Sequence, residues 1–198
     1  MTETARRRGR PGYDLEGLLT AAAELFYERG YDGTSIQDLA NRLGVGKSAI
    51  YHHVPSKEAL LGLAVGRALD SLFAEVAKLG GGRAVDRLEQ LVRGSIAVLV
   101  AELPFVTLLL RVRGNTETER AALARRREFD RIVTDLVAQA AADGDLRADV
   151  DPATTTRLLF GMVNSLIEWY RPDGGLKPAD LAETVIAVAF DGLRVRGA

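Results

Sequence analysis

The residues of this chain with the clearest chemical potential lie close together, between positions 47 and 52. They comprise a cation, two small side chains and two flat polar rings, which are Lys47, Ser48, Ala49, Tyr51 and His52. If this segment is helical, the aliphatic Ile50 faces a neighbouring element and the other side chains stay on the outer surface. Small side chains let a helix enter the major groove of DNA, where longer ones reach base edges or phosphates. The pattern predicts a helix that reads double-stranded DNA.

The residues before this segment have the composition needed to position it. Leu39, Ala40, Leu43 and Val45 supply apolar contacts, and Gly44 permits the left-handed backbone that ends one helix and redirects the chain toward the next. Two short helices joined by such a turn form a helix-turn-helix, whose second helix, at about residues 46–53 here, lies in the major groove.

Residues 30–60 resemble the DNA-binding domain of the TetR family of bacterial transcriptional regulators. The resemblance is carried by Gly30–Ser35, Leu39-Ala40, Gly44-Val45, Ile50–Val54 and Ser56–Leu60. It implies a dimeric repressor that binds a double-stranded operator. It also implies a DNA-binding domain with three helices at residues 1–55 and a helical ligand-binding and dimerisation domain at residues 56–198.

The same resemblance assigns DNA contacts to particular positions. The five side chains on the outer face of the predicted reading helix match the family's contacts, Thr34 is expected to join them, and Lys57 matches a phosphate contact at the start of the fourth helix. One departure is Ala49, where many members carry threonine. A methyl group can touch the methyl of thymine but cannot form a hydrogen bond.

A basic arm precedes the first predicted helix. Arg6, Arg7, Arg8 and Arg10 stand in a stretch without acidic residues. Such arms can lie along phosphates or enter the minor groove, so we expect Arg8 and Arg10 to contact DNA. The alternative is an arm that only improves solubility.

Helix signals fill the rest of the sequence. Ser56 can cap a long helix that ends at Gly80–Gly82, and the Thr116–Glu119 segment is a capping box for a helix that runs to Ala142. Asp151-Pro152 and Pro178 begin the last two helices. Together with a helix at about residues 83–102 and a short one after Pro104, the pattern predicts an all-α protein of nine helices.

The last two predicted helices are hydrophobic on more than one face. One of these faces must be covered by something other than the domain's own core. The resemblance implies a four-helix dimer contact here, while packing within a single chain is the alternative. The expected interface residues are Leu158, Leu166, Leu181, Val185, Val188 and Ala189.

A ligand cavity is expected among the fifth to eighth helices. The expected ligand-binding residues, of which each apolar one could instead be ordinary core, are Phe105, Leu109, Arg113, Phe129, Val133, Met162, Ser165 and Trp169. Residues 111–131 hold seven arginines against four carboxylates, a net charge of +3. Arginine side chains suit phosphate groups, although a solvated helix face with paired charges would have the same composition.

Residues 164–178 and 190–193 resemble the C-terminal domains of TetR-type regulators of fatty-acid, steroid and aromatic-acid breakdown, several of which respond to acyl-CoA thioesters. This resemblance favours an acyl-CoA or aryl-CoA effector, such as phenylacetyl-CoA. A free hydrophobic drug or metabolite is one alternative. An architectural DNA-binding dimer without a ligand response is another.

Catalytic chemistry has little support in the residues. The two histidines, His52 and His53, are adjacent, so on a helix they point about 100° apart and cannot chelate a metal as an i, i+4 pair does. No phosphate loop, nucleophile elbow or paired acid stands out. We therefore expect no catalytic residue, no metal and no cofactor, and a protein that is not an enzyme.

Composition agrees with a regulator inside the cell. A chain of 198 residues that is 47% hydrophobic can bury a sizeable core, and it has no cysteine for disulfides. Its net charge of −1 argues against a nonspecific coat on nucleic acid. No segment approaches the about 18 apolar residues of a membrane span. We expect a soluble, cytoplasmic protein without a membrane partner.

Overall fold

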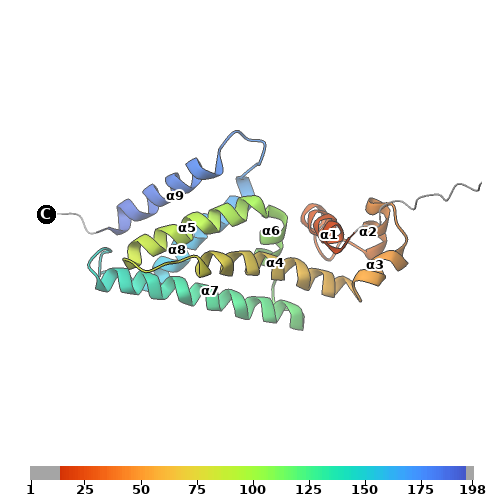
Figure 1. Cartoon of the computed structure of the whole chain (residues 1–198), viewed down its shortest axis with the longest axis horizontal. Coiled ribbons are helices and arrows are strands. Elements are labelled where there is room, and N and C mark those ends of the chain that lie inside the picture. Colours follow the sequence, from red (N-terminus) through yellow and green to blue (C-terminus); the bar gives the residue numbers. More distant parts are fainter. Residues whose placement is uncertain (1–13, 195–198) are drawn as a thin grey trace, which may run out of the picture. The chain divides into compact units, whose positions relative to one another are not determined.

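The computed structural model describes residues 14–194, and within this range the chain is entirely helical apart from turns and one isolated bridge between Leu146 and Arg194 (Figure 1). The predicted all-α fold of nine helices is confirmed for these residues. The helices are α1 (Leu15–Arg29), α2 (Ile36–Leu43), α3 (Lys47–His53), α4 (Lys57–Ala77), α5 (Ala84–Ala101), α6 (Leu103–Arg111), α7 (Glu117–Ala142), α8 (Pro152–Trp169) and α9 (Pro178–Leu193).

The chain divides into two compact units, residues 1–60 and 61–198, and the division falls within α4. The first unit is built on α1, α2 and α3. Its core is formed by side chains from all three helices, including Leu18 and Phe26 of α1, Leu39 of α2 and Ile50 of α3, each at most 2% exposed.

Polar residues at the helix starts explain where the helices begin. Asp14, Ser35, Thr116 and Asp151 each accept a backbone N–H of the first turn of their helix. This satisfies a donor that has no partner within the helix. The predicted caps at Thr116 and Asp151 are therefore present.

The predicted capping box at Thr116 is only half formed. The Thr116 hydroxyl accepts the N–H of Glu119, but the Glu119 carboxylate turns away from the cap and accepts the backbone N–H groups of Arg113, Gly114 and Asn115 at 3.2, 2.7 and 2.8 Å. The loop before α7 offers three donors where the cap offers one. The buried carboxylate thus holds this loop rather than the helix end.

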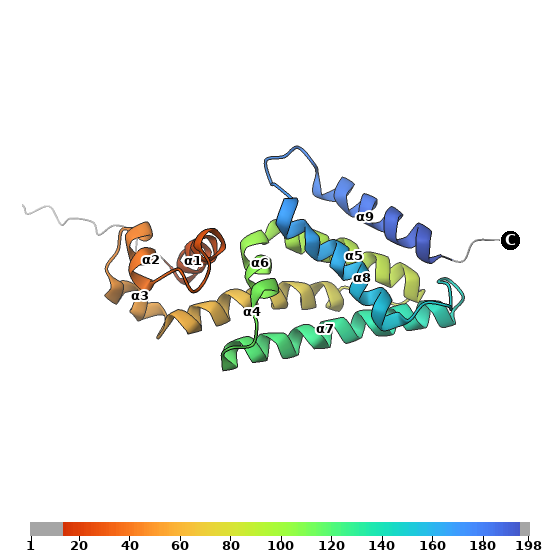
Figure 2. The ribbon, with the colours of Figure 1, turned by 180° about the vertical axis from the view of Figure 1, so that it is seen from behind.

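In the second unit, α5 lies at the centre and packs against α6, α7, α8 and α9 (Figures 1 and 2). Phe129 of α7 packs edge-on against Phe73 of α4 and Phe160 of α8, with ring centres 6.1 and 5.4 Å apart. This aromatic row joins three helices around the unit's interior. Two of its rings, Phe129 and Phe160, also border the cavities described below.

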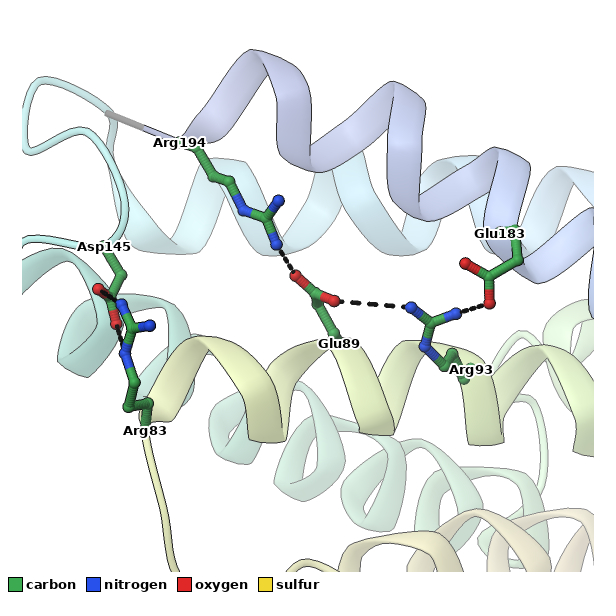
Figure 3. A network of polar contacts seen from close by, with 6 residues as sticks. All are labelled: Arg83, Glu89, Arg93, Asp145, Glu183 and Arg194. Carbon is green, nitrogen blue, oxygen red and sulfur yellow. Dashed lines mark hydrogen bonds and ion pairs between the residues drawn. The ribbon is translucent and has the colours of Figure 1, made fainter. Parts of the chain in front are cut away.

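Helix α9 is attached to α5 by an apolar seam and a chain of ion pairs. Ile186 and Phe190 are buried in the seam. Outside it, Arg194 pairs with Glu89, and Arg93 bridges Glu89 and Glu183 (Figure 3). A separate pair, Arg83 with Asp145, joins the start of α5 to the loop after α7.

Across the described residues, no single helix has the length and apolar character of a membrane span. Only α5 and α6 taken together reach that composition, and a bend of 104° separates them.

Candidate nucleic-acid interface and ligand cavity

Helix α3 is held in the first unit by one buried residue. Ile50 is 1% exposed, and the turn before α3 is fixed by Gly44, which adopts the left-handed conformation at φ 65° and donates its N–H to Ala40 and Asn41. The Val45 N–H also donates to the Ala40 carbonyl at 3.0 Å. This geometry is the glycine turn that the sequence predicts between two short helices.

The outer face of α3 carries the side chains expected to contact DNA. All five of these residues, Lys47, Ser48, Ala49, Tyr51 and His52, are exposed. A single helix therefore presents a cation, two hydroxyl groups, a methyl group and an imidazole to solvent. These groups can contact base edges and phosphates in a major groove.

Thr34 and Lys57 have structural partners within the first unit. Thr34 is buried, and its hydroxyl donates to the Gly30 carbonyl at 2.8 Å. The Lys57 ammonium donates to the carbonyls of Tyr31 and Thr34, both at 2.9 Å, and lies 4.2 Å from the centre of the Tyr31 ring. An ammonium has three N–H groups, so a phosphate contact by Lys57 would use the third.

The charge of Arg42 is already matched inside the first unit. Its guanidinium pairs with Glu28 at 2.8 Å and with Glu24 at 3.2 Å, which joins α2 to α1. The basic stretch at residues 39–57 therefore offers Lys47 and Lys57 to a polyanion, and Arg42 chiefly stabilises the helix pair. Arg8 and Arg10 lie outside the described residues.

The second unit contains a cavity lined by arginines, here called the arginine cavity. It has a volume of about 670 Å³ and lies between α7 and α8. Four of its lining residues are arginines and one is acidic, which are Arg126, Arg127, Arg131, Arg157 and Asp130. Four cations against one carboxylate give this cavity an excess of positive charge, and guanidinium groups suit phosphates in particular.

Five of the seven arginines of residues 111–131 divide into two groups, while Arg111 and Arg113 are exposed outside the cavity. Arg125 pairs with Asp70 of α4 at 2.7 Å, and Arg120 donates to the carbonyls of Gly114 and Asn115. Arg126, Arg127 and Arg131 face the arginine cavity instead. Arg127 and Arg131 are exposed to solvent, so they also fit the alternative of a solvated helix face.

Burial raises the pKa of the Asp130 carboxyl, and the charges of Arg126 and Arg157 partly oppose this rise. An isolated carboxylate loses water when it is buried, which disfavours its charged form. The positive charges of the cavity thus only partly offset the free-energy cost of burying the charged carboxylate of Asp130.

A second, smaller cavity of about 40 Å³ adjoins the first and is called the apolar cavity here. Both cavities are bordered by Arg126, Asp130, Phe160 and Asn164. The remaining lining is almost wholly apolar and comes from α4 to α8, namely Leu69, Leu72, Ser95, Leu99, Val106, Leu109, Leu110, Phe129 and Val163. The arginine cavity and a small hydrophobic space therefore share part of their lining.

The expected ligand residues lie in different places. Leu109 and Phe129 line the apolar cavity. Phe105 and Val133 are buried outside the lining of either cavity, and the Phe105 ring lies under the Arg67 guanidinium at 4.4 Å. Met162 is half-buried. The exposed members of the set, which lie outside both cavities, are Arg113, Ser165 and Trp169.

The cavity-facing side of α8 carries Arg157, Phe160 and Asn164, of which the sequence pointed to Asn164 as a polar candidate but not to Arg157 or Phe160. The three residues are spaced three and four positions apart, which places them on one face of the helix. The signal that would have found Arg157 and Phe160 is this spacing beside the arginines of α7. Ser95 of α5 was also missed, because one serine among apolar residues gives no pattern.

Fewer of the expected interface residues of α8 and α9 are exposed than the sequence indicates. Leu158 and Val188 are 67% and 66% exposed, and Val185 is half-buried. Leu166, Leu181 and Ala189, which were expected in a dimer contact, are buried in the chain's own core. Both helices use one apolar face to pack within the second unit, which leaves only the opposite face for a partner.

Comparisons with known proteins match both units. The family model "Bacterial regulatory proteins, tetR family" matches residues 18–64, and the model "Tetracyclin repressor-like, C-terminal domain" matches residues 81–193. The transcriptional repressor KstR2 of Rhodococcus jostii is 29% identical over 190 residues, which cover 93% of each chain.

Solved structures agree with these matches. A TetR regulator from Streptomyces coelicolor A3 has 54% sequence identity and a TM-score of 0.83, and the match covers 90% of this chain and 91% of that one. AibR, in complex with isovaleryl coenzyme A and operator DNA, has 27% identity and a TM-score of 0.79, over 88% and 97% of the two chains.

Proposed function

Since this chain belongs to the TetR family of bacterial transcriptional regulators, we propose that it is a homodimeric repressor released from a palindromic operator by a CoA thioester. The relatives are DNA-binding regulators and not enzymes. We place the protein in the bacterial cytoplasm, where its operator would lie.

In this proposal, α3 reads the operator. Lys47, Tyr51 and His52 contact bases or phosphates, while Ser48 and Ala49 allow close approach to the groove. Thr34 and Lys57 support the loop before α2, and the third N–H of Lys57 contacts a phosphate. Two-fold symmetry presents two copies of α3 to half-sites roughly 34 to 36 Å apart. The exposed faces of α8 and α9 around Leu158 and Val188 form the dimer contact.

The observation that carries the effector proposal is the junction of the two cavities. A CoA thioester joins a phosphate-rich nucleotide to an apolar acyl group, and the arginine cavity adjoins the apolar cavity at four shared lining residues. The phosphates are bound by Arg126, Arg127, Arg131 and Arg157, and the acyl group enters among Leu109, Phe129 and their neighbours. The complex of AibR with isovaleryl coenzyme A supports this assignment by likeness.

Helix α4 offers a route for the response. Leu69 and Leu72 line the apolar cavity, while Lys57 in the first turn of the same helix holds two carbonyls of the loop before α2. Acyl binding that shifts α4 would therefore disturb this loop and the spacing of the reading helices. Thermodynamic linkage requires effector and operator to weaken one another's binding by the same factor.

The test is a titration of free and operator-bound protein with acyl-CoA esters, phenylacetyl-CoA, the free acids and CoA itself. We expect at least one ester to bind the free protein more tightly than the complex. Arg126→Ala and Arg131→Ala should each weaken ester binding by about tenfold, the loss of one charge-assisted contact. The matched control, Arg113→Ala, removes an exposed arginine outside the cavity and should leave ester affinity unchanged.

Other outcomes favour the other functions. Binding of free acids alone would indicate a regulator of a free hydrophobic metabolite and would leave the cavity arginines without a ligand role. Equal affinity of every compound for free and operator-bound protein would indicate a DNA-binding dimer that does not respond to these ligands.

A further inference from the structure

Ser95 is a buried hydroxyl group without a partner at the apolar cavity. The residue lies in the middle of α5 and is 2% exposed, and its Oγ atom forms no hydrogen bond with any described residue. A helical serine can usually bond to the carbonyl four residues earlier. Leaving a buried hydroxyl unpaired costs free energy, so such a group in a cavity wall points to a ligand atom that completes it.

The position of Ser95 relative to the other polar groups determines which end of a bound ligand would lie near Ser95. Arg126, Asp130 and Asn164 border both cavities, and in the proposed function they form the entrance to the apolar one. Ser95 lines only the apolar cavity, together with leucines and valines. A ligand that enters from the arginine side meets Ser95 with its buried end.

The volume of the apolar cavity limits the size of the ligand group that can lie beside Ser95. One water-sized group needs about 10 to 15 Å³ of such space, so 40 Å³ holds about three non-hydrogen atoms beyond the entrance. A phenyl ring or a steroid ring system exceeds this volume. Short acyl groups fit.

We infer that the effector is a short-chain acyl-CoA with a hydroxyl or carbonyl oxygen near the end of its acyl group, and that Ser95 recognises this oxygen. The inference rests on the proposed CoA-ester function and narrows it. The serine hydroxyl can donate to a carbonyl oxygen and can both donate to and accept from a hydroxyl. A saturated acyl group of the same length would leave the hydroxyl unpaired and bind more weakly.

The experiment compares butyryl-CoA, 3-hydroxybutyryl-CoA, acetoacetyl-CoA and phenylacetyl-CoA by calorimetric titration of the full-length protein. We expect the two oxygenated esters to bind at least about tenfold more tightly than butyryl-CoA, since one completed hydrogen bond is worth about that factor. Phenylacetyl-CoA should bind most weakly.

Ser95→Ala should abolish the preference for oxygenated esters. Butyryl-CoA should keep its affinity, while the affinity of the oxygenated esters should fall to that of butyryl-CoA. Thr107→Val is the matched control. Thr107 is another buried residue whose hydroxyl has no hydrogen bond within residues 14–194, but it lies outside the lining of the apolar cavity. Its replacement should leave the preference intact, and thermal unfolding of both variants checks that they fold.

Two failures can be told apart. Binding of CoA esters without a preference for the oxygenated ones, or a preference that survives Ser95→Ala, would overturn the role of Ser95 and leave the proposed function standing. If no CoA ester binds the wild-type protein, the proposed effector class and this inference both fall.

Discussion

Replacing Lys47 by alanine should change the salt dependence of operator binding by an amount that follows from the structure. Lys47 stands exposed in the first turn of α3, so the change leaves the core around Ile50 intact. The proposed dimer on a palindrome would carry two copies, and each lost phosphate contact lowers the slope of log K against log salt by about 0.9. We expect the magnitude of the slope to fall by about 1.8.

Arg42 provides the control for this prediction. It is also a cation of the helix-turn-helix, but its guanidinium is bound to Glu24 and Glu28. Arg42→Gln should therefore leave the salt slope unchanged, while the loss of a surface ion pair costs up to about 1 kcal/mol of stability. Tyr51→Phe removes a hydrogen bond and no charge, so it should weaken binding by the same factor at every salt concentration.

The assay is fluorescence anisotropy with a duplex that the protein itself selects from a random pool, measured between about 50 and 200 mM salt. An unchanged slope in Lys47→Ala would remove Lys47 from the phosphate contacts. An equal fall in Arg42→Gln would show that the slope reports the net charge of the domain and not a specific contact.

Three further predictions concern assembly, the cavity and the turn. Leu158→Glu and Val188→Glu each place a charge on an exposed apolar face, so light scattering should detect folded monomers; a stable dimer in both variants would place the interface elsewhere. Because burial raises the pKa of Asp130, its charged form destabilises the fold, so Asp130→Asn should raise the thermal unfolding temperature at pH 7. This gain should vanish as the pH falls through the raised pKa toward 3.8, where the wild-type carboxyl is also protonated; a gain independent of pH would refute the assignment. Gly44→Ala forces a side chain into the left-handed region and should lower the free energy of unfolding by about 1 kcal/mol, measured by urea denaturation, and an unchanged value would contradict the role given to the glycine.

The first unit follows the sequence closely because its determinants are local. Gly44 sets the turn and Ile50 supplies the buried side of α3. The other side chains of α3 are thereby left on its exposed face, which is the face predicted to read DNA. Helix starts were predictable for the same reason, since a cap and the N–H group it accepts are separated by three residues or fewer.

The cavity depends on contacts that are distant in sequence. Helix α8 is apolar on more than one face, so its pattern alone does not say whether Asn164 or Ser165 faces inward, and these residues point about 100° apart. Packing against α7 selects Asn164. The same holds for Arg42, whose partners precede it by 14 and 18 residues.

The attachment of α9 has a consequence for the behaviour of the chain in different solutions. Outside the apolar seam, this helix is held by the ion pairs of Glu89, Arg93, Glu183 and Arg194, whose charged groups are partly exposed to solvent. Salt screens such pairs, with a Debye length of about 10 Å at 0.1 M and about 3 Å at 1 M. Local opening of a helix precedes global unfolding where few buried apolar contacts hold it, and the amide protons of such a helix exchange first. Because buried side chains such as Ile186 and Phe190 hold α9 on α5 at any salt concentration, we expect higher ionic strength to shorten the hydrogen-exchange lifetime of this helix only modestly.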